Sequence, residues 1–175
     1  MEKYTMMNLS FISRLAVLEH ADRTRDAIDD LVKILRYLEE PGAKIKTVVA
    51  EMKIIDKMCR IQEMKKGKAY HCLINNALHE DRCYIPAGIM ANALRLTMDK
   101  EIVEGRESVE VILSVKASEE GVCIIIKDNG DTRGYVSGPI YEASYGLFKA
   151  TYEAGVKSLD LEIKPGIGTK VIVQI

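Results

Sequence analysis

The spacing of apolar residues changes along this 175-residue chain, and that change constrains the fold more than any other feature. Up to about residue 66, apolar side chains recur every three or four positions, as they do on one face of an amphipathic helix. From Val109 onward they alternate with polar or smaller side chains, as they do in half-buried strands. The sequence therefore predicts an α+β fold in which helices come first and most of a sheet follows.

Residues 2–19 and a second segment ending near Glu39 are predicted to form an antiparallel helical hairpin, because the link between them is short and polar. Each helix has one apolar stripe, and a lone hairpin cannot cover both stripes. Association of two hairpins into a dimeric four-helix bundle would cover them, and packing on the rest of the chain is the alternative. The stripes consist of Met7, Phe11, Leu15 and Leu18 in the first helix and Ile28, Leu31, Leu35 and Leu38 in the second.

Pro41-Gly42 ends the hairpin, so we expect a hairpin domain at residues 1–42 and a second domain at residues 43–175. The second domain should open with a helix capped by Thr47, followed by a strand at about residues 69–74. Another helix should begin with Pro86 in its first turn and run to about residue 98. Strands are expected near residues 109–115 and 122–126, a helix near 146–154, and two paired strands near 159–163 and 171–175.

The charge balance is nearly neutral, with 25 Lys and Arg against 26 Asp and Glu, so nothing favours nucleic acid or an anionic membrane as partner. No apolar run approaches the roughly 18 residues that a membrane-spanning helix needs, and residues 1–10 lack the apolar core of a signal peptide. The 4 cysteines show no paired spacing, which favours free thiols in a reducing compartment. A cytoplasmic protein is expected.

Three short segments are candidates for a binding site. Asn92 lies in the helix after Pro86, Asp128-Asn129-Gly130 follows an apolar strand, and Gly166-Ile167-Gly168-Thr169 precedes the last strand. Each is weak alone, since Asp-Asn-Gly is a common tight turn and Pro-Gly-Ile-Gly suits a hairpin. Their order along the chain carries more information than any one of them.

The predicted elements follow a definite order along the chain. A helix with Asn92 comes first, then two strands, an Asp-x-Gly turn, a helix opening with Gly146-Leu147, a strand and a Gly-x-Gly-Thr turn. This order resembles the ATP-binding domain shared by histidine kinases, gyrase and MutL. Upstream, Leu35-Arg36-Tyr37 and Tyr84-Ile85-Pro86 resemble sensor kinases that regulate autolysis, so the likeness extends over nearly the whole chain. It implies a histidine-kinase-type α/β sandwich with a mixed, largely antiparallel sheet, and ATP or ADP with Mg²⁺ as cofactors.

The resemblance also implies roles for particular residues. In this family the Asn helps to hold Mg²⁺, the Asp accepts a hydrogen bond from the adenine amino group, and glycine-rich loops bring backbone N–H groups to the phosphates. Asn92 would thus be a Mg²⁺ ligand. The implied nucleotide-binding residues are Asn92, Asp128, Gly130, Gly146, Gly168 and Thr169.

Several functional positions of the family carry other residues here. Ser10 stands where the family has its phosphoacceptor His, and Ala91 stands where it has Glu, the candidate general base. Thr132 and Ser144 replace glycines of the nucleotide-binding loops, and Lys149 replaces an Asn. A side chain at a position that requires positive φ or close phosphate approach costs about 1 kcal/mol or more. These substitutions argue against efficient ATP turnover.

The predicted function is that of a two-component-type signalling protein, a pseudokinase that works mainly by protein–protein interaction and binds ATP or ADP weakly. It would be a homodimer, with a sensor kinase or a response regulator as partner and without nucleic acid or membrane insertion. One alternative is an active ATP-dependent histidine kinase that uses His20 as phosphoacceptor. Another is a phosphotransferase or an anti-sigma-type interaction module that has the same fold without ATPase activity.

Overall fold

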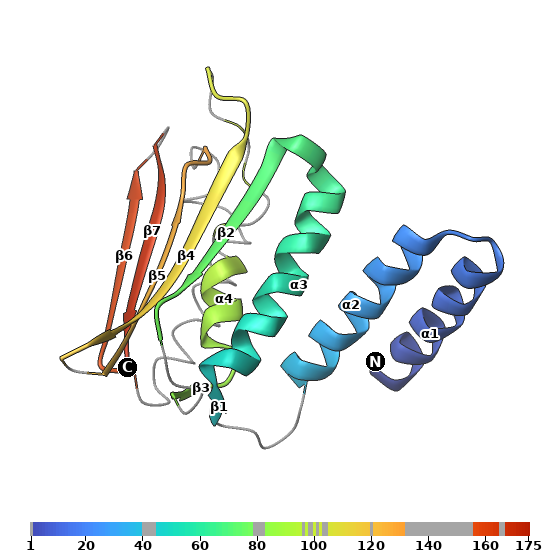
Figure 1. Ribbon diagram of the computed structural model, residues 1–175, viewed down its shortest axis with the longest axis horizontal. Coiled ribbons are helices and arrows are strands. Elements are labelled where there is room, and N and C mark those ends of the chain that lie inside the picture. Colours follow the sequence, from blue (N-terminus) through green and yellow to red (C-terminus); the bar gives the residue numbers. More distant parts are fainter. Residues whose placement is uncertain are drawn as a thin grey trace.

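The computed structural model of this protein describes residues 2–39, 45–78, 83–95, 97, 100, 102, 105–119, 121–131, 156–164 and 167–175. A sheet lies at one end of the molecule, the helices α3 and α4 lie along one of its faces, and a helical hairpin lies beyond α3 (Figure 1). No helix in these described residues is long and apolar enough to cross a membrane. The predicted α+β class is confirmed.

The hairpin consists of α1 (Glu2–Leu18) and α2 (Asp22–Glu39), which pack against each other as predicted (Figure 1). The turn between them is a helix C-terminal motif centred on His20, whose φ is +55°. The N–H of Ala21 donates to the carbonyl of Ala16 at 2.8 Å, and that of His20 donates to the carbonyl of Val17 at 3.2 Å. This pair of bonds is the Schellman arrangement, in which glycine is the usual residue at the left-handed position.

The apolar stripe of α1 remains largely uncovered in a single chain, whereas Ile28 and Leu35 in the stripe of α2 are half-buried. Phe11 is 61% exposed and Leu18 is 76% exposed, and Leu15 and Leu31 are also exposed. Ala16, Val32 and Ile34 are buried instead. The side chains of Met7 and Leu38 lie outside the described residues. Packing on the rest of the chain therefore does not cover the exposed members of the predicted stripes.

The hairpin packs on the second part of the chain through α2 and α3 (Val48–Lys66). The carboxylate of Asp30 lies 3.3 Å from Nζ of Lys57 and 2.8 Å from the guanidinium of Arg60. Because Asp30 is buried, these two cations neutralise a charge that water does not reach well. The predicted domain boundary between residues 42 and 43 lies outside the described residues.

Helix α3 begins where the sequence predicts. The side chain of Thr47 accepts a hydrogen bond from the N–H of Ala50 at 3.2 Å, as an N-cap does. The helix ends at Gly67, whose φ of +61° suits glycine, and a short 3₁₀ turn η1 (Gly67–Ala69) leads into the first long strand. Ile54, Ile55 and Met58 are buried on the side that faces the sheet.

The sheet has five strands in the order β2-β4-β5-β7-β6, where β2 is parallel to β4 and all other neighbours are antiparallel. The predicted mixed, largely antiparallel sheet is confirmed, including the hairpin of the last two strands. The strands are β2 (Tyr70–Asn76), β4 (Val109–Ser118), β5 (Gly121–Asp128), β6 (Ser158–Lys164) and β7 (Gly168–Gln174).

The two faces of the sheet differ, as the alternating pattern predicts. Leu113, Ile124 and Val171 are completely buried on the face that α3 and α4 cover. The register places Ile112, Lys127 and Lys170 side by side on the opposite face, and that face is open to solvent. The core therefore lies between one sheet face and the helices.

The prediction that Pro86 lies in the first turn of a helix is wrong. Pro86 is the last residue of a short strand, β3 (Tyr84–Pro86), which pairs antiparallel with β1 (Ile45–Thr47). Helix α4 (Ile89–Arg95) begins three residues later. Pro at a strand end loses no ladder bond, so the same residue serves either structure. The predicted helix at residues 146–154 lies outside the described residues.

The expectation of four free thiols is wrong for two of them. Cys59 on α3 and Cys72 on β2 form a disulfide, with their Cα atoms 5.9 Å apart. Cys83 and Cys123 are free. The spacing along the sequence gave no sign of this pair, because the antiparallel return of β2 along α3 brings the two residues together.

Candidate functional site

Asp128, Gly130, Gly168 and Thr169 come together at one end of the sheet. Asp128 is the last residue of β5, and its Oδ1 accepts a hydrogen bond from the N–H of Gly130 at 2.9 Å. Gly168 opens β7 with φ +141°, and a Cβ there would overlap the carbonyl oxygen of Asp128. Glycine is therefore required at 168 for both conformation and space. We call these four residues the Asp128 cluster.

Lys100 closes the Asp128 cluster. Its Nζ lies 2.6 Å from Oδ2 of Asp128 and also donates to Oγ1 of Thr169. The side chains of Lys100 and Asp128 are both 0% exposed. A Cβ at position 130 would lie 2.7 Å from Cβ of Lys100, so the glycine there makes room for the lysine chain.

The sequence gives no sign that Lys100 is buried. It stands in Asp99-Lys100-Glu101, an alternation of charges that is typical of a solvated surface. The burial of Lys100 follows from a physical requirement and not from a sequence pattern, because a buried carboxylate needs a cation or several hydrogen-bond donors. Only the fold brings Lys100 to Asp128, 28 positions further along the chain.

Known proteins are similar to this chain in fold but not in sequence. No family model and no curated protein matches it. A solved bacterial phosphotransferase matches 97% of this chain and 86% of its own, with a TM-score of 0.58 and 10% identity. A mycobacterial sensor histidine kinase, MprB, matches 74% of this chain and 93% of its own, with a TM-score of 0.53 and 12% identity.

A third neighbour is full-length ShkA in complex with AMPPNP, which matches 89% of this chain and 37% of its own at a TM-score of 0.53 and 13% identity. The chain has a histidine-kinase-type ATPase fold. This confirms the fold that the motif order implied, although identities this low carry no residue roles.

The resemblance of the motif order implied that the carboxylate of Asp128, at the end of β5, would accept a hydrogen bond from the adenine amino group. Here Oδ2 of Asp128 lies against the ammonium of Lys100, and Oδ1 accepts from Gly130. The carboxyl group is also completely buried. The residues present therefore do not fit an adenine base at Asp128, because the lysine already holds the position that the amino group would take.

Burial and pairing act in opposite directions on this ion pair. Burial raises the pKa of Asp128 and lowers the pKa of Lys100, while the attraction between the two charges opposes both shifts. The N–H groups of Gly130 and Thr169 also favour the ionised carboxylate. Each member thus depends on the other, and losing one partner of such a buried pair costs about 3–5 kcal/mol.

A small cavity adjoins the cluster on the open face of the sheet. Its volume is about 170 Å³, and Lys127, Glu162 and Lys170 contribute to its walls together with Asp128 and Gly168. Small-molecule pockets usually hold about 300–1,000 Å³. The cavity is too small for a nucleotide.

The other predicted positions are less informative. Asn92 is half-buried on α4, and its role as a Mg²⁺ ligand stays a prediction. Ala91 is completely buried in the core, so its side chain supplies no base. Among the described residues, no three His, Cys, Asp or Glu side chains are grouped so as to hold a metal. Gly146 lies outside the described residues. Ser10 is half-buried on α1.

Glu51 on α3 is a second buried carboxyl group. Its Oε2 accepts from the N–H of Met90 at 3.2 Å, and its Oε1 accepts from the N–H of Gly88 and the hydroxyl of Tyr37. Burial raises the pKa of Glu51, and these hydrogen bonds oppose that shift. Glu51 therefore fixes the turn before α4 and links it to α2 of the hairpin.

Proposed function

We propose that this protein is a signalling protein of the two-component type that keeps the kinase fold as a scaffold and does not use ATP. The observation that carries this proposal is the buried pair of Lys100 and Asp128. An ammonium group 2.6 Å from the carboxylate occupies the hydrogen-bonding position on which adenine recognition would depend. A neutral adenine amino group cannot displace it without separating the charge of a buried lysine from its carboxylate.

The positions that would perform phosphoryl transfer support the same proposal. Ala91 is buried in the core and provides no carboxylate to activate a phosphoacceptor. Ser10 has a hydroxyl in place of an imidazole, so the phosphoramidate from which phosphate passes readily to an Asp cannot form there. In this proposal, the residues for nucleotide recognition and those for phosphoryl transfer both differ from the kinase pattern, while the fold is retained.

Protein–protein interaction is the mode of action that we propose, with the hairpin as the dimerisation element. Phe11 and Leu18 are 61% and 76% exposed, so their apolar surface is in contact with water. A partner hairpin that covers them would remove the unfavourable free energy of that contact. A second copy offers the same stripe, as a two-fold symmetric contact requires. The other partner in this proposal is a sensor kinase or a response regulator.

Nucleotide titration of the full chain tests the proposal that this protein does not use ATP. Calorimetry with Mg·ADP and Mg·ATP should show no saturable heat up to about 1 mM, and neither nucleotide should raise the melting temperature. Micromolar binding that Asp128→Asn abolishes would contradict the proposal. Binding that survives in Asp128→Asn would also contradict the proposal, and it would locate the nucleotide away from Asp128.

The dimer is tested separately by sedimentation. Phe11→Asp places a charge in the exposed stripe and should convert a dimer to a monomer, whereas Arg23→Asp, on an exposed polar position of α2, should leave the dimer intact. A wild-type chain that sediments as a monomer at high concentration would contradict the dimer, independently of the nucleotide result.

A phosphotransferase is the second candidate, favoured by the similarity of fold to a bacterial phosphotransferase over 97% of this chain. It would need His20, which is exposed in the hairpin turn. Incubation with a phosphorylated response regulator should then give acid-labile label that His20→Gly removes. Glycine suits the left-handed φ of +55° at this position, so loss of label in that variant would not reflect a broken turn.

A further inference from the structure

The outer edge of β2 has backbone groups that no other strand in the described part of the chain covers. β2 is the first strand in the sheet order, and the N–H of Ala77 donates across to the carbonyl of Val115 in β4 at 2.9 Å. Because strand residues alternate, Cys72, Ile74 and Asn76 direct their N–H and C=O groups away from β4. They therefore form a free edge.

This edge is protected at one end only. The N–H of Cys72 donates to Oε1 of Glu63 on α3 at 3.3 Å, so the side chain of the helix covers that position. Among the described residues, the outward backbone groups of Ile74 and Asn76 have no such partner. The unprotected half of the edge is also where a cavity opens between helix and strand.

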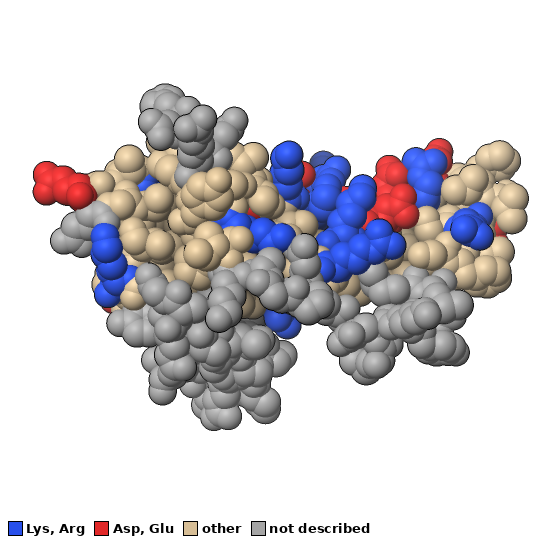
Figure 2. Space-filling view, turned by 90° about the horizontal axis from the view of Figure 1, so that it is seen from below, with Lys and Arg blue, Asp and Glu red and all other residues tan. Residues whose placement is uncertain are grey.

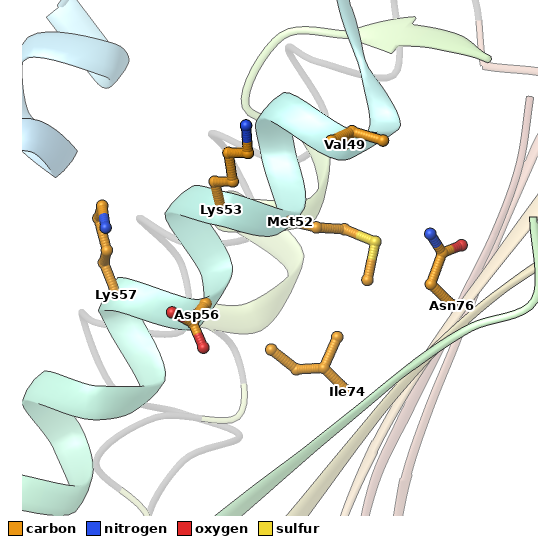
Figure 3. Close-up of a pocket in the computed structure, with 7 residues that line it drawn as sticks. All are labelled: Val49, Met52, Lys53, Asp56, Lys57, Ile74 and Asn76. Carbon is orange, nitrogen blue, oxygen red and sulfur yellow. The ribbon is translucent and has the colours of Figure 1, made fainter. Parts of the chain in front are cut away.

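That cavity, which we call the β2-edge groove, has a volume of about 350 Å³. Figure 3 shows Met52 pointing from α3 towards β2, and Ile74 and Asn76 pointing from β2 into the space below the helix. Val49 adds to the apolar wall. The groove is large enough for at least one apolar side chain and lies directly beside unpaired backbone groups.

The open face of the sheet is also apolar beside this edge. Leu73 points to the open face of the sheet, where it is 55% exposed beside Ile112. Side chains of an added strand would alternate between the two faces. One would enter the β2-edge groove against Met52, and the next would cover Leu73.

Basic side chains lie beside the groove, and two of them already pair with carboxylates. Lys57 and Arg60 share the carboxylate of Asp30, and Arg60 also lies 3.5 Å from Asp56. Lys53 has no acidic partner among the described residues and lines the groove. In Figure 2, Lys and Arg side chains gather over the middle of the molecule, in the part where α2 and α3 lie in Figure 1.

We propose that the free edge of β2 binds an extended, acidic segment of a partner protein by strand addition. Ile74 and Asn76 supply backbone hydrogen bonds, the groove at Met52 takes one apolar side chain, and Lys53 at the rim of the groove faces an acidic side chain that flanks it. This surface is separate from the Asp128 cluster and from the exposed stripe of α1, so it stands whether or not nucleotide binds.

Two synthetic heptapeptides, capped at both ends, test the proposal on the full chain. In both, Val and Leu alternate with charged residues, which are Asp and Glu in one peptide and Lys in the other. The acidic peptide should bind at least tenfold more tightly than the basic one by calorimetry. In its presence the amide hydrogens of Ile74 and Asn76 should exchange at least tenfold more slowly, and those of β6, the other edge of the sheet, should not change.

Variants separate strand addition from simple charge attraction. Asn76→Pro removes one outward N–H without touching the ladder to β4, and proline is tolerated on an edge strand in this orientation, so binding should fall at least tenfold in a folded protein. Lys53→Glu should weaken binding of the acidic peptide at least fivefold. Lys127→Glu, a matched charge change on β5, should have no effect.

Four outcomes would overturn the proposal. They are failure of the acidic peptide to bind, equal binding by Asn76→Pro and the wild type, protection of β6 in place of β2, and concentration-dependent protection of Ile74 and Asn76 without peptide. The last result would mean that a second copy of this chain occupies the edge.

Discussion

Asp128 and Glu51 are both buried carboxyl groups, but their surroundings differ in one respect. Asp128 lies 2.6 Å from a lysine ammonium, whereas Glu51 accepts hydrogen bonds from neutral donors, the hydroxyl of Tyr37 and the N–H groups of Gly88 and Met90. Burial raises the pKa of both. Neutral donors suffice for a structural carboxyl group that joins elements. The carboxyl group at the end of β5 instead has a buried cation as its partner.

The largest effect should come from removing the cation. Lys100→Met should lower the free energy of unfolding by about 3–5 kcal/mol, because Asp128 then stays buried without its partner. The double variant Lys100→Met with Asp128→Leu should recover most of that loss. Urea unfolding of the four proteins in the cycle measures it. A single-variant loss below about 1 kcal/mol would show that the pair is open to water.

The pH dependence of Glu51 should give an intermediate effect. Its folded pKa lies above its unfolded value, so its contribution to stability is present below the unfolded pKa and is lost as pH rises through the folded pKa. The stability of the wild type relative to Glu51→Gln should therefore fall with rising pH, by about 1.4 kcal/mol for each unit of pKa shift. Urea unfolding from acid to neutral pH measures the difference. A difference that grows with pH would have the wrong sign.

The smallest effect should come from one neutral donor of Glu51. Tyr37→Phe removes the hydroxyl that links α2 to Glu51 and should cost about 0.5–1.5 kcal/mol. The loss should be nearly absent in a Glu51→Gln background if the two side chains act as a pair. Thermal unfolding in both backgrounds tests this. Equal losses in the two backgrounds would mean that Tyr37 contributes through packing alone.

The sequence predicted the fold better than the site, for a physical reason. Alternation of apolar residues and the cap at Thr47 are local signals, so the strands and α3 could be placed from them. Pro86 was assigned to the wrong element because its fixed φ suits a helix start as well as a strand end. The burial of Lys100 depends on a contact with Asp128 that no local pattern encodes.

Nitrogen-15 NMR of the lysine side chains tests most directly whether Lys100 holds Asp128. The Lys100 ammonium should be protected from exchange with water, and its Nζ resonance should shift in Asp128→Asn. The exposed ammonium of Lys127 should exchange fast, and its resonance should not shift in that variant. Mg·ADP should leave the Lys100 resonance unchanged. A Lys100 ammonium that exchanges as fast as that of Lys127, or that Mg·ADP displaces, would show that Lys100 does not hold Asp128.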